Sequence, residues 1–230
     1  LYYASEGGIG LARSDDGVTF TKSPNPVLTR DPSIAWETTP PSAPSVAVLP
    51  DGRFRMLYAA GVFIGEAESA DGVAWRRLDA DPSTPAIDPV LGPGPGVDPA
   101  ALAPGEKPPF DTGEVGDPCL VPRLTVEGRL HFRVLYTGWD APPGTPGRQS
   151  TIGFAARYGD AGPLSRQRAP VYAAGRQESS PSLVELPFGV MLYVQQDRLV
   201  DSKTSYSAVA AALSPATLRL DHPEGFADGP

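Results

Sequence analysis

Hydrophobic and polar residues alternate over short stretches of this chain, with a period of two. The segments 53–58 (Arg-Phe-Arg-Met-Leu-Tyr) and 129–133 (Arg-Leu-His-Phe-Arg) show the pattern. A period of two is typical of β-strands that bury one face. Turn signals such as Pro50-Asp51-Gly52 separate the stretches. The pattern predicts many short strands joined by turns rather than long helices.

The strand pattern repeats along the chain. An Ile-Gly strand occurs three times, with a degenerate fourth copy, at residues 9–10, 64–65, 152–153 and 207–212. A strand that ends in tyrosine precedes each copy, at Tyr3, Tyr58, Tyr136 and Tyr193. A third element, Pro-Ser/Cys-Val/Leu, precedes the last three tyrosines, at 44–46, 118–120 and 181–183. Asp-Gly turns, which are strong hairpin signals, follow two of the Ile-Gly strands.

Each unit therefore contains four short strands in a fixed order. Four-stranded units that recur after roughly 55 residues predict an all-β fold, a β-propeller of antiparallel blades. We expect one propeller domain over residues 1–230, with blade repeats near 1–30, 42–91, 113–173 and 178–220. A β-sandwich with chance internal similarity is the alternative.

Composition and charge narrow the classes of function. The chain has 25 glycines and 28 prolines among 230 residues, and its 40% hydrophobic content is enough for a packed core. The net charge of −8 argues against nucleic acid or an anionic membrane surface as a partner. The single Cys119 excludes an internal disulfide and is interpreted as a small buried residue. Two isolated histidines offer no zinc spacing.

The repeated phrases resemble those of the five-bladed β-propeller glycoside hydrolases, namely family 43 arabinanases and xylosidases with their fructosidase and mannoside phosphorylase relatives. Residues 9–20, Phe110-Asp111-Thr112-Gly113 with Gly116-Asp117-Pro118, and the Leu-Tyr strands carry the resemblance. It implies a glycosidase that acts on arabinose-, xylose- or fructose-containing glycans, with a secreted, extracellular or periplasmic location favoured. It implies no required cofactor, although some relatives carry a structural Ca²⁺ on the propeller axis.

In this family, carboxylates from several blades meet at one sugar in the central funnel, where one serves as base and another as acid. The resemblance implies that Asp117 is the aspartate that modulates the acid or stabilises the transition state. It implies that Glu178, about one blade later, is the general acid. Two residues separate Glu178 from Pro181 where the family commonly has one, so the side chain could point elsewhere.

Four loop residues near the ends of the inner strands are candidate sugar ligands: Trp36, Glu37, Trp139 and Asp140. Aromatic faces can stack on a sugar ring, and the acids can accept hydrogen bonds from its hydroxyls. Packing over a neighbouring blade is the alternative for the tryptophans.

The third carboxylate is missing from the visible repeats. Ala43 stands where an inner-strand acid would be expected, and the base would lie about two blades before Asp117, upstream of residue 1. Asp31-Pro32-Ser33-Ile34 mimics the base motif but is interpreted as a connecting turn. We therefore expect a five-bladed ring that lacks about one blade on its N-terminal side, with an unusual smaller ring as the alternative.

Two other functions remain open at this point. A non-catalytic propeller that binds glycan or protein would account for Ala43 and for the imperfect Glu178 motif. A sialidase-like propeller would account for residues 15–20, which resemble an Asp box, although Arg13 stands where a serine belongs. The sequence predicts no oligomeric state.

Overall fold

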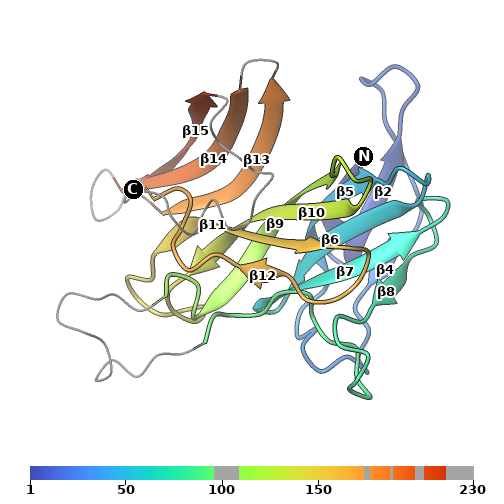
Figure 1. The fold of residues 1–230 in the computed structure, drawn as a ribbon, viewed down its shortest axis with the longest axis horizontal. Coiled ribbons are helices and arrows are strands. Elements are labelled where there is room, and N and C mark those ends of the chain that lie inside the picture. The colour runs from blue at the N-terminus through green and yellow to red at the C-terminus, as the bar shows by residue number, and fades with distance from the viewer. Residues whose placement is uncertain (96–108, 174–176, 187–188, 200–204, 216–230) are drawn as a thin grey trace.

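A computed structural model describes residues 1–95, 109–173, 177–186, 189–199 and 205–215 (Figure 1). These residues form fifteen strands in four antiparallel sheets, and no helix long and apolar enough to span a membrane occurs among them. The sheets have the arrangement of a β-propeller, which confirms the predicted fold class. Residues 96–108, and the end of the last predicted repeat, 216–220, lie outside the described residues.

The four sheets follow one another along the chain. The first contains β1 (Tyr2–Ser5), β2 (Gly8–Arg13), β3 (Thr21–Lys22) and β4 (Leu28–Thr29). The second contains β5 (Ser42–Val48), β6 (Phe54–Ala60), β7 (Phe63–Ser69) and β8 (Arg76–Leu78). The third contains β9 (Glu114–Leu124), β10 (Leu130–Trp139), β11 (Ser150–Tyr158) and β12 (Ser165–Arg166). The fourth contains β13 (Glu178–Leu186), β14 (Gly189–Leu199) and β15 (Ser205–Pro215).

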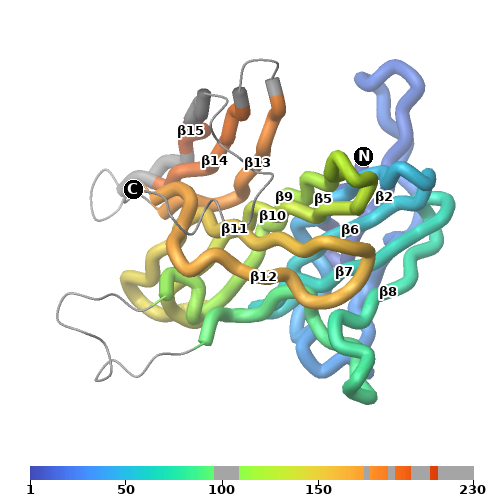
Figure 2. Tube along the Cα trace, in the orientation of Figure 1, coloured from blue at the N-terminus to red at the C-terminus, as the bar shows by residue number. Residues whose placement is uncertain are grey.

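Successive sheets lie side by side in chain order, from the first at one side of the molecule to β13–β15 at the other (Figures 1 and 2). The strands β5, β9 and β13 are the inner strands, since β9 contacts both of the others. Three hydrophobic clusters fill the spaces between successive sheets. Their most buried members include Ile9, Met56, Ile64, Val115, Val134 and Ile152. Burial of these apolar surfaces holds neighbouring blades together.

A tyrosine packed on a glycine explains the regular spacing of the repeat. Tyr58 on β6 lies directly opposite Gly65 on β7, and Tyr136 on β10 lies opposite Gly153 on β11. A Cβ atom at either glycine would stand only 2.4 Å from Cζ of its tyrosine. The glycine of each Ile-Gly strand is therefore required by the ring that crosses it.

The predicted equivalence of Tyr193 with these tyrosines is wrong by one residue. Tyr193 pairs with Ser182, in the way that Leu135 pairs with Cys119, so Val194 takes the position of Tyr136. Val194 is 2% exposed and Tyr193 is 38% exposed. Because side chains alternate between the faces of a strand, a one-residue offset moves the tyrosine to the other face.

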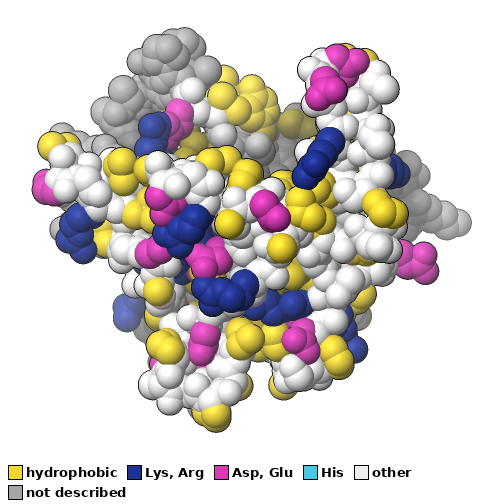
Figure 3. All heavy atoms as spheres, turned by 90° about the vertical axis from the view of Figure 1, so that its right-hand side faces the viewer, with side chains coloured by type: hydrophobic (Ala, Val, Ile, Leu, Met, Phe, Trp, Pro, Cys, Tyr) yellow, Lys and Arg dark blue, Asp and Glu magenta, His cyan; other side chains and the backbone are white. Residues whose placement is uncertain are grey.

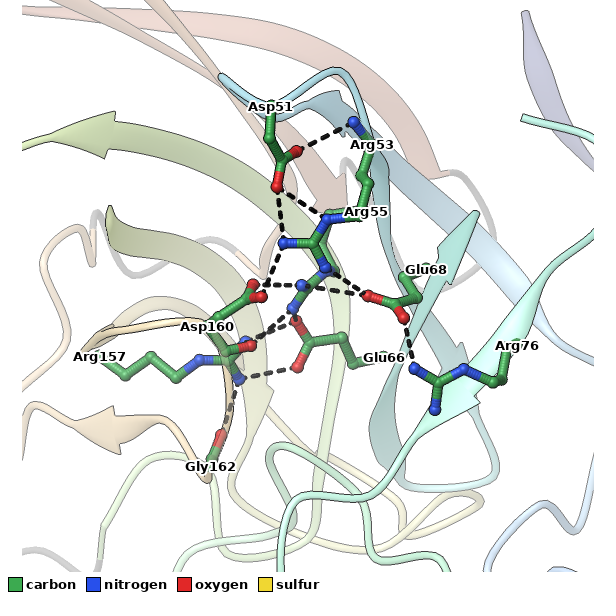
Figure 4. A network of polar contacts seen from close by, with 9 residues as sticks. All are labelled: Asp51, Arg53, Arg55, Glu66, Glu68, Arg76, Arg157, Asp160 and Gly162. Atoms are coloured by element: carbon green, nitrogen blue, oxygen red, sulfur yellow. Dashed lines mark hydrogen bonds and ion pairs between the residues drawn. The ribbon is translucent and has the colours of Figure 1, made fainter. Parts of the chain in front are cut away.

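Buried charges link the second sheet to the third (Figure 4). Glu66 on β7 accepts hydrogen bonds from Arg55 Nη1 (2.5 Å) and from Arg157 Nη1 and Nη2 (2.7 and 2.6 Å). Arg55 also pairs with Asp160, and both guanidinium groups lie over the ring of Phe132, 5.1 and 4.7 Å from its centroid. Glu66 thus pairs with two arginines that come from different blades, and Asp160 supplies a second negative charge.

The Asp-Gly turns after β2 and β7 use the same hydrogen bonds. Asp71 Oδ1 accepts from the amides of Val73 and Ala74, both at 2.8 Å, and from the Ser69 hydroxyl at 2.9 Å. The backbone hydrogen bonds, followed by that of Ser69, hold the pKa of Asp71 below its ordinary value. Asp16 has equivalent partners in the connection between β2 and β3, which projects from the body of the molecule (Figure 2).

Charged side chains of both signs are interspersed on the face viewed in Figure 3, where basic groups lie beside acidic ones. Among the ion pairs of the protein, Arg76 and Arg53 both bind Glu68 on β7.

Candidate functional site

Three inner strands share an unusual backbone feature at the same place. The residue before proline has a left-handed conformation in each: Ala43 (φ 45°), Asp117 (φ 45°) and Ser180 (φ 50°). A β-bulge interrupts the pairing at each position. Left-handed residues other than glycine cost about 1–3 kcal/mol each, and bulges redirect side chains at functional sites. This repeated strained bulge defines the candidate site.

Asp117 is the one acid at these three positions. Its Oδ2 atom accepts hydrogen bonds from Thr137 Oγ1 (3.1 Å) and Ser180 Oγ (3.2 Å). Thr137, on β10, is fully buried, and its oxygen also accepts a hydrogen bond from the Ser180 amide (3.0 Å). Because that amide occupies an acceptor position of Thr137, the threonine hydroxyl hydrogen is directed at Asp117. Two blades thus orient one carboxylate.

Trp139 packs on the residue that precedes Asp117. Its ring packs on Gly116, where a Cβ atom would stand 3.2 Å from Trp139 Cζ3. The guanidinium of Arg148 lies over the ring, 4.9 Å from its centroid, and pairs with Glu114 at 2.6 Å. The candidate site therefore includes an aromatic ring that a partly buried ion pair holds in place.

Asp140 is exposed and stabilises the loop that follows it. Its Oδ1 atom accepts a hydrogen bond from the Gln149 amide (2.8 Å), and its carbonyl accepts one from Thr112 Oγ1 (2.8 Å). These bonds close the loop 140–149 at the edge of the site. The role of Trp139 and Asp140 as sugar ligands stays a prediction.

Glu178 is fully buried, in contrast to the partly exposed Asp117. It pairs with Gln196 on β14, so it occupies the position that Val115 holds in the previous blade. Gln196 lies on the same face as Val194, which packs between the third and fourth sheets, and its amide donates to Tyr172 Oη (3.3 Å). Ser180, two residues further on, takes the bulge position. The extra residue before Pro181 thus directs Glu178 into the interface between blades.

Trp36 and Glu37 form a cap between the first and second sheets. Glu37 is fully buried and accepts hydrogen bonds from Tyr58 Oη (2.8 Å) and from Arg77 Nε (2.7 Å). Trp36 stacks on Tyr58, with ring centroids 6.1 Å apart, and donates Nε1–H to the Ile87 carbonyl. These partners occupy both residues with interactions inside the protein.

The next blade repeats this cap with different residues. Asp111 accepts hydrogen bonds from Tyr136 Oη (2.8 Å) and Arg166 Nη1 (2.5 Å), while Phe110 stacks on Tyr136 at 6.1 Å. Burial, followed by the adjacent carboxylate charge, raises the pKa of both tyrosines. Each acid stands six residues before the bulge residue of its blade, a spacing visible in the sequence.

The remaining candidates from the sequence are Asp31, Cys119 and a metal site. Asp31 lies in a turn, with its carboxylate bound to Ser33, which agrees with its interpretation as a connecting segment. Burial raises the pKa of the Cys119 thiol. Among the described residues, no group of three or more His, Cys, Asp or Glu side chains could hold a metal ion, and a Ca²⁺ on the axis stays a prediction.

Comparisons with known proteins show that the chain is similar in fold to solved structures of glycoside hydrolases. No family model and no curated protein matches its sequence. The structure of a BT0996 complex with RGII superimposes with a TM-score of 0.61 at 13% identity, over 93% of this chain and 66% of that protein. A glycoside hydrolase gives 0.58 at 13% identity, with the same two coverages.

A glycosyl hydrolase from Bacteroides ovatus gives a TM-score of 0.59 at 14% identity, over 91% of this chain and 58% of that protein. The chain therefore shares the propeller fold of glycoside hydrolases, as the repeated phrases indicate. It spans less than two thirds of the length of these three proteins.

Proposed function

We propose that this propeller is a glycoside hydrolase whose substrate binds at the bulged ends of β5, β9 and β13. The observation that carries the proposal is Asp117, a carboxylate held in a left-handed bulge by hydroxyl groups from two blades. Strain of this kind is typical of functional sites. The fold shared with glycoside hydrolases supports the same class of reaction.

Asp117 has one oxygen committed to Thr137 and Ser180. In the described part of the chain, no hydrogen bond to its Oδ1 atom is found. This oxygen is the one that would accept a hydrogen bond from a sugar hydroxyl and stabilise the positive charge of an oxocarbenium-like transition state. Trp139 and Asp140 would contact the same sugar from the edge of the site.

Glu178 would protonate the leaving oxygen in this proposal. Because its side chain is fully buried, that role requires the start of β13 to move when substrate binds. We propose arabinose-, xylose- or fructose-containing glycans as substrates, on the basis of the repeated phrases in the sequence. The site is proposed to bind carbohydrate without a cofactor.

Hydrolysis assays test the proposal directly. Aryl arabinofuranosides, aryl xylosides, arabinan, xylan and fructan would be incubated with the protein and with the Asp117→Asn variant, and released sugar would be measured. We expect the variant to lose activity by about 100-fold or more, because a group that stabilises transition-state charge is lost. Asp15→Asn, in the exposed connection after β2, is the charge-matched control and should keep full activity. Full activity of Asp117→Asn would refute the proposal.

A non-catalytic glycan-binding propeller is the second candidate. It is favoured by the bulge residues Ala43 and Ser180, which leave one acid at three equivalent positions, and by the burial of Glu178. Calorimetry with the same glycans separates the two functions. Binding that Asp117→Asn abolishes, with no sugar released by the unmodified protein, would establish this second function and exclude hydrolysis of these substrates.

A further inference from the structure

The strand β13, which begins with Glu178, is anchored to the third sheet at its far end. Leu183 packs in the hydrophobic cluster between the third and fourth sheets. Glu185 accepts a hydrogen bond from Arg133 Nη2 at 2.7 Å, and Arg133 is buried. A movement that brings Glu178 out of the interface therefore has to take place at the start of the strand.

The start of β13 is held by Ser180, two residues after Glu178. The Ser180 amide donates to Thr137 Oγ1 (3.0 Å), and its hydroxyl donates to Asp117 Oδ2 (3.2 Å). Thr137 donates to the same carboxylate oxygen (3.1 Å). The carboxylate of the candidate site thus also fastens the segment that carries the buried Glu178.

This connection is not part of the general repeat. In the second sheet, Ala43 takes the bulge position of Asp117. Ala59 takes the place of Thr137, because each pairs with the residue before the bulge position. Alanine side chains form no hydrogen bonds. The two hydroxyls and the carboxylate are therefore an addition at the boundary between the third and fourth sheets.

The segment 177–180 has a strained backbone. Gln177 (φ 23°) and Ser180 (φ 50°) are left-handed residues on either side of Glu178. Such residues persist only where their surroundings hold them. Gln177 Nε2 donates to the Arg148 carbonyl at 3.4 Å, so the hydrogen bonds of Ser180 are the shorter connections of this segment to the third sheet. Their loss would leave a strained segment weakly held.

We propose that Thr137 and Ser180 are positioning residues that form a latch with Asp117 and keep Glu178 buried until a sugar binds. The inference rests on the proposed function, which gives Glu178 the role of the acid. A sugar hydroxyl that donates to Asp117 Oδ2 would take the place of the Ser180 hydroxyl. Asp117 then keeps two donors on this oxygen while the start of β13 is released.

The substrate can supply this donor because sugars carry adjacent hydroxyl groups. A carboxylate has two oxygens, each of which accepts hydrogen bonds. One hydroxyl would bind Asp117 Oδ1, and its neighbour on the same sugar would reach Oδ2. Binding of the sugar and release of Glu178 are thereby a single exchange of hydrogen bonds.

Amide hydrogen exchange measured by mass spectrometry tests the latch in the free protein. Thr137→Val removes the acceptor of the Ser180 amide and a donor to Asp117. We expect about 10-fold faster exchange over residues 177–186, because loss of these bonds favours local opening by about this factor. Ser180→Ala removes one bond and should accelerate exchange by less. Thr137→Ser keeps the hydroxyl and should restore the exchange rate of the unmodified protein.

Thr151→Val on β11 is the matched control. Within the described residues, the Thr151 hydroxyl is buried and has no hydrogen-bond partner, so its removal should leave exchange over residues 177–186 unchanged. Ser182→Ala, further along β13, should also have no effect. Exchange in β6 and β7 should stay the same in every variant, which separates release of the latch from a general loss of stability.

A double variant tests the role of the carboxylate. Asp117→Ala and Ser180→Ala remove the same hydrogen bond, so their combined effect on exchange should be smaller than the product of the single effects. Multiplicative effects, unchanged exchange in Ser180→Ala, or equal acceleration in β6 and β7 would overturn the latch. Because Ser180 is exposed, this variant decides the matter even where Thr137→Val fails to fold.

The same measurement with xylo- and arabino-oligosaccharides separates the latch from the proposed function. A bound oligosaccharide should accelerate exchange over residues 177–186 in the unmodified protein. Slower exchange in the complex would overturn release by the sugar. Absence of binding would contradict the proposed function and release by these sugars, while the variants of the free protein still decide whether the latch exists.

Discussion

Removal of the charge of Glu66 should strongly destabilise the protein. Glu66 is 4% exposed and accepts three hydrogen bonds from two arginines. In the Glu66→Gln variant, Arg55 keeps Asp160 as a counter-charge, but the remaining hydrogen-bond partners of Arg157 are the carbonyls of Gly162 and Asp160. Arg157 would then be a buried cation without a carboxylate.

The size of the effect follows from this loss. Breaking a buried ion pair by removing one partner costs about 3–5 kcal/mol. A chain of this size shifts its melting temperature by about 2–4 °C per kcal/mol, which gives a decrease of about 6–20 °C. Thermal unfolding followed by circular dichroism measures the shift, with calorimetry to check that one transition is observed.

Glu68 provides the matched control on the same strand. It pairs closely with Arg53 and Arg76, whose side chains are 37% and 70% exposed, and lies 3.6 Å from the buried Arg55, which keeps Glu66 and Asp160 as counter-charges. Water can solvate these cations after Glu68→Gln, so we expect a loss of only about 1 kcal/mol. Similar melting temperatures for the two variants would show that the burial of Glu66 does not increase its contribution to stability, and would refute the reasoning.

Two further predictions concern the repeat itself. Gly153→Ala should lower the free energy of unfolding in denaturant by about 1–3 kcal/mol, because the new Cβ would stand 2.4 Å from Tyr136 Cζ. Gly7→Ala, whose Cβ would have its nearest atom at 3.6 Å, should change the free energy of unfolding little. Equal effects of the two substitutions would argue against the Tyr–Gly packing. Asp71→Ala should lower the melting temperature at neutral pH, and the difference from the unmodified protein should shrink as pH falls below about 4 and through the lower folded-state pKa of Asp71, because both states then bind the proton. A difference that persists in acid would mean that the Asp71 charge does not contribute, and Asp15→Asn serves as the control.

The architecture could be predicted because its cause is local and repeated. Alternating strands, Asp-Gly turns and the Tyr/Ile-Gly spacing each reflect contacts within one blade, so the sequence shows them directly. The position of Tyr193 could not be predicted in this way. Its neighbour Val194 fits the buried face equally well, and the choice between the two depends on the bulge in β13 and its pairing with β14.

The residues of the candidate site were harder to predict from the sequence, because their roles depend on contacts with residues of other blades. An acid beside a loop tryptophan fits a sugar site, yet Glu37 is bound by Tyr58 and Arg77. The equal six-residue spacings from Glu37 to Ala43 and from Asp111 to Asp117 were the signal that could have revealed the cap. The support of Asp117 by Thr137 and Ser180 has no such signal, since it joins two blades.

The left-handed bulge before proline has a consequence for how a ring of this kind can diversify. The same backbone shape holds Ala43, Asp117 and Ser180, so the shape does not depend on the side chain that it presents. A single substitution at any of the three positions can then place or remove a charge near the axis without repacking the sheets. The three inner strands therefore offer equivalent backbone positions. A functional side chain can be gained at one of them and lost at another while the blades keep the same structure.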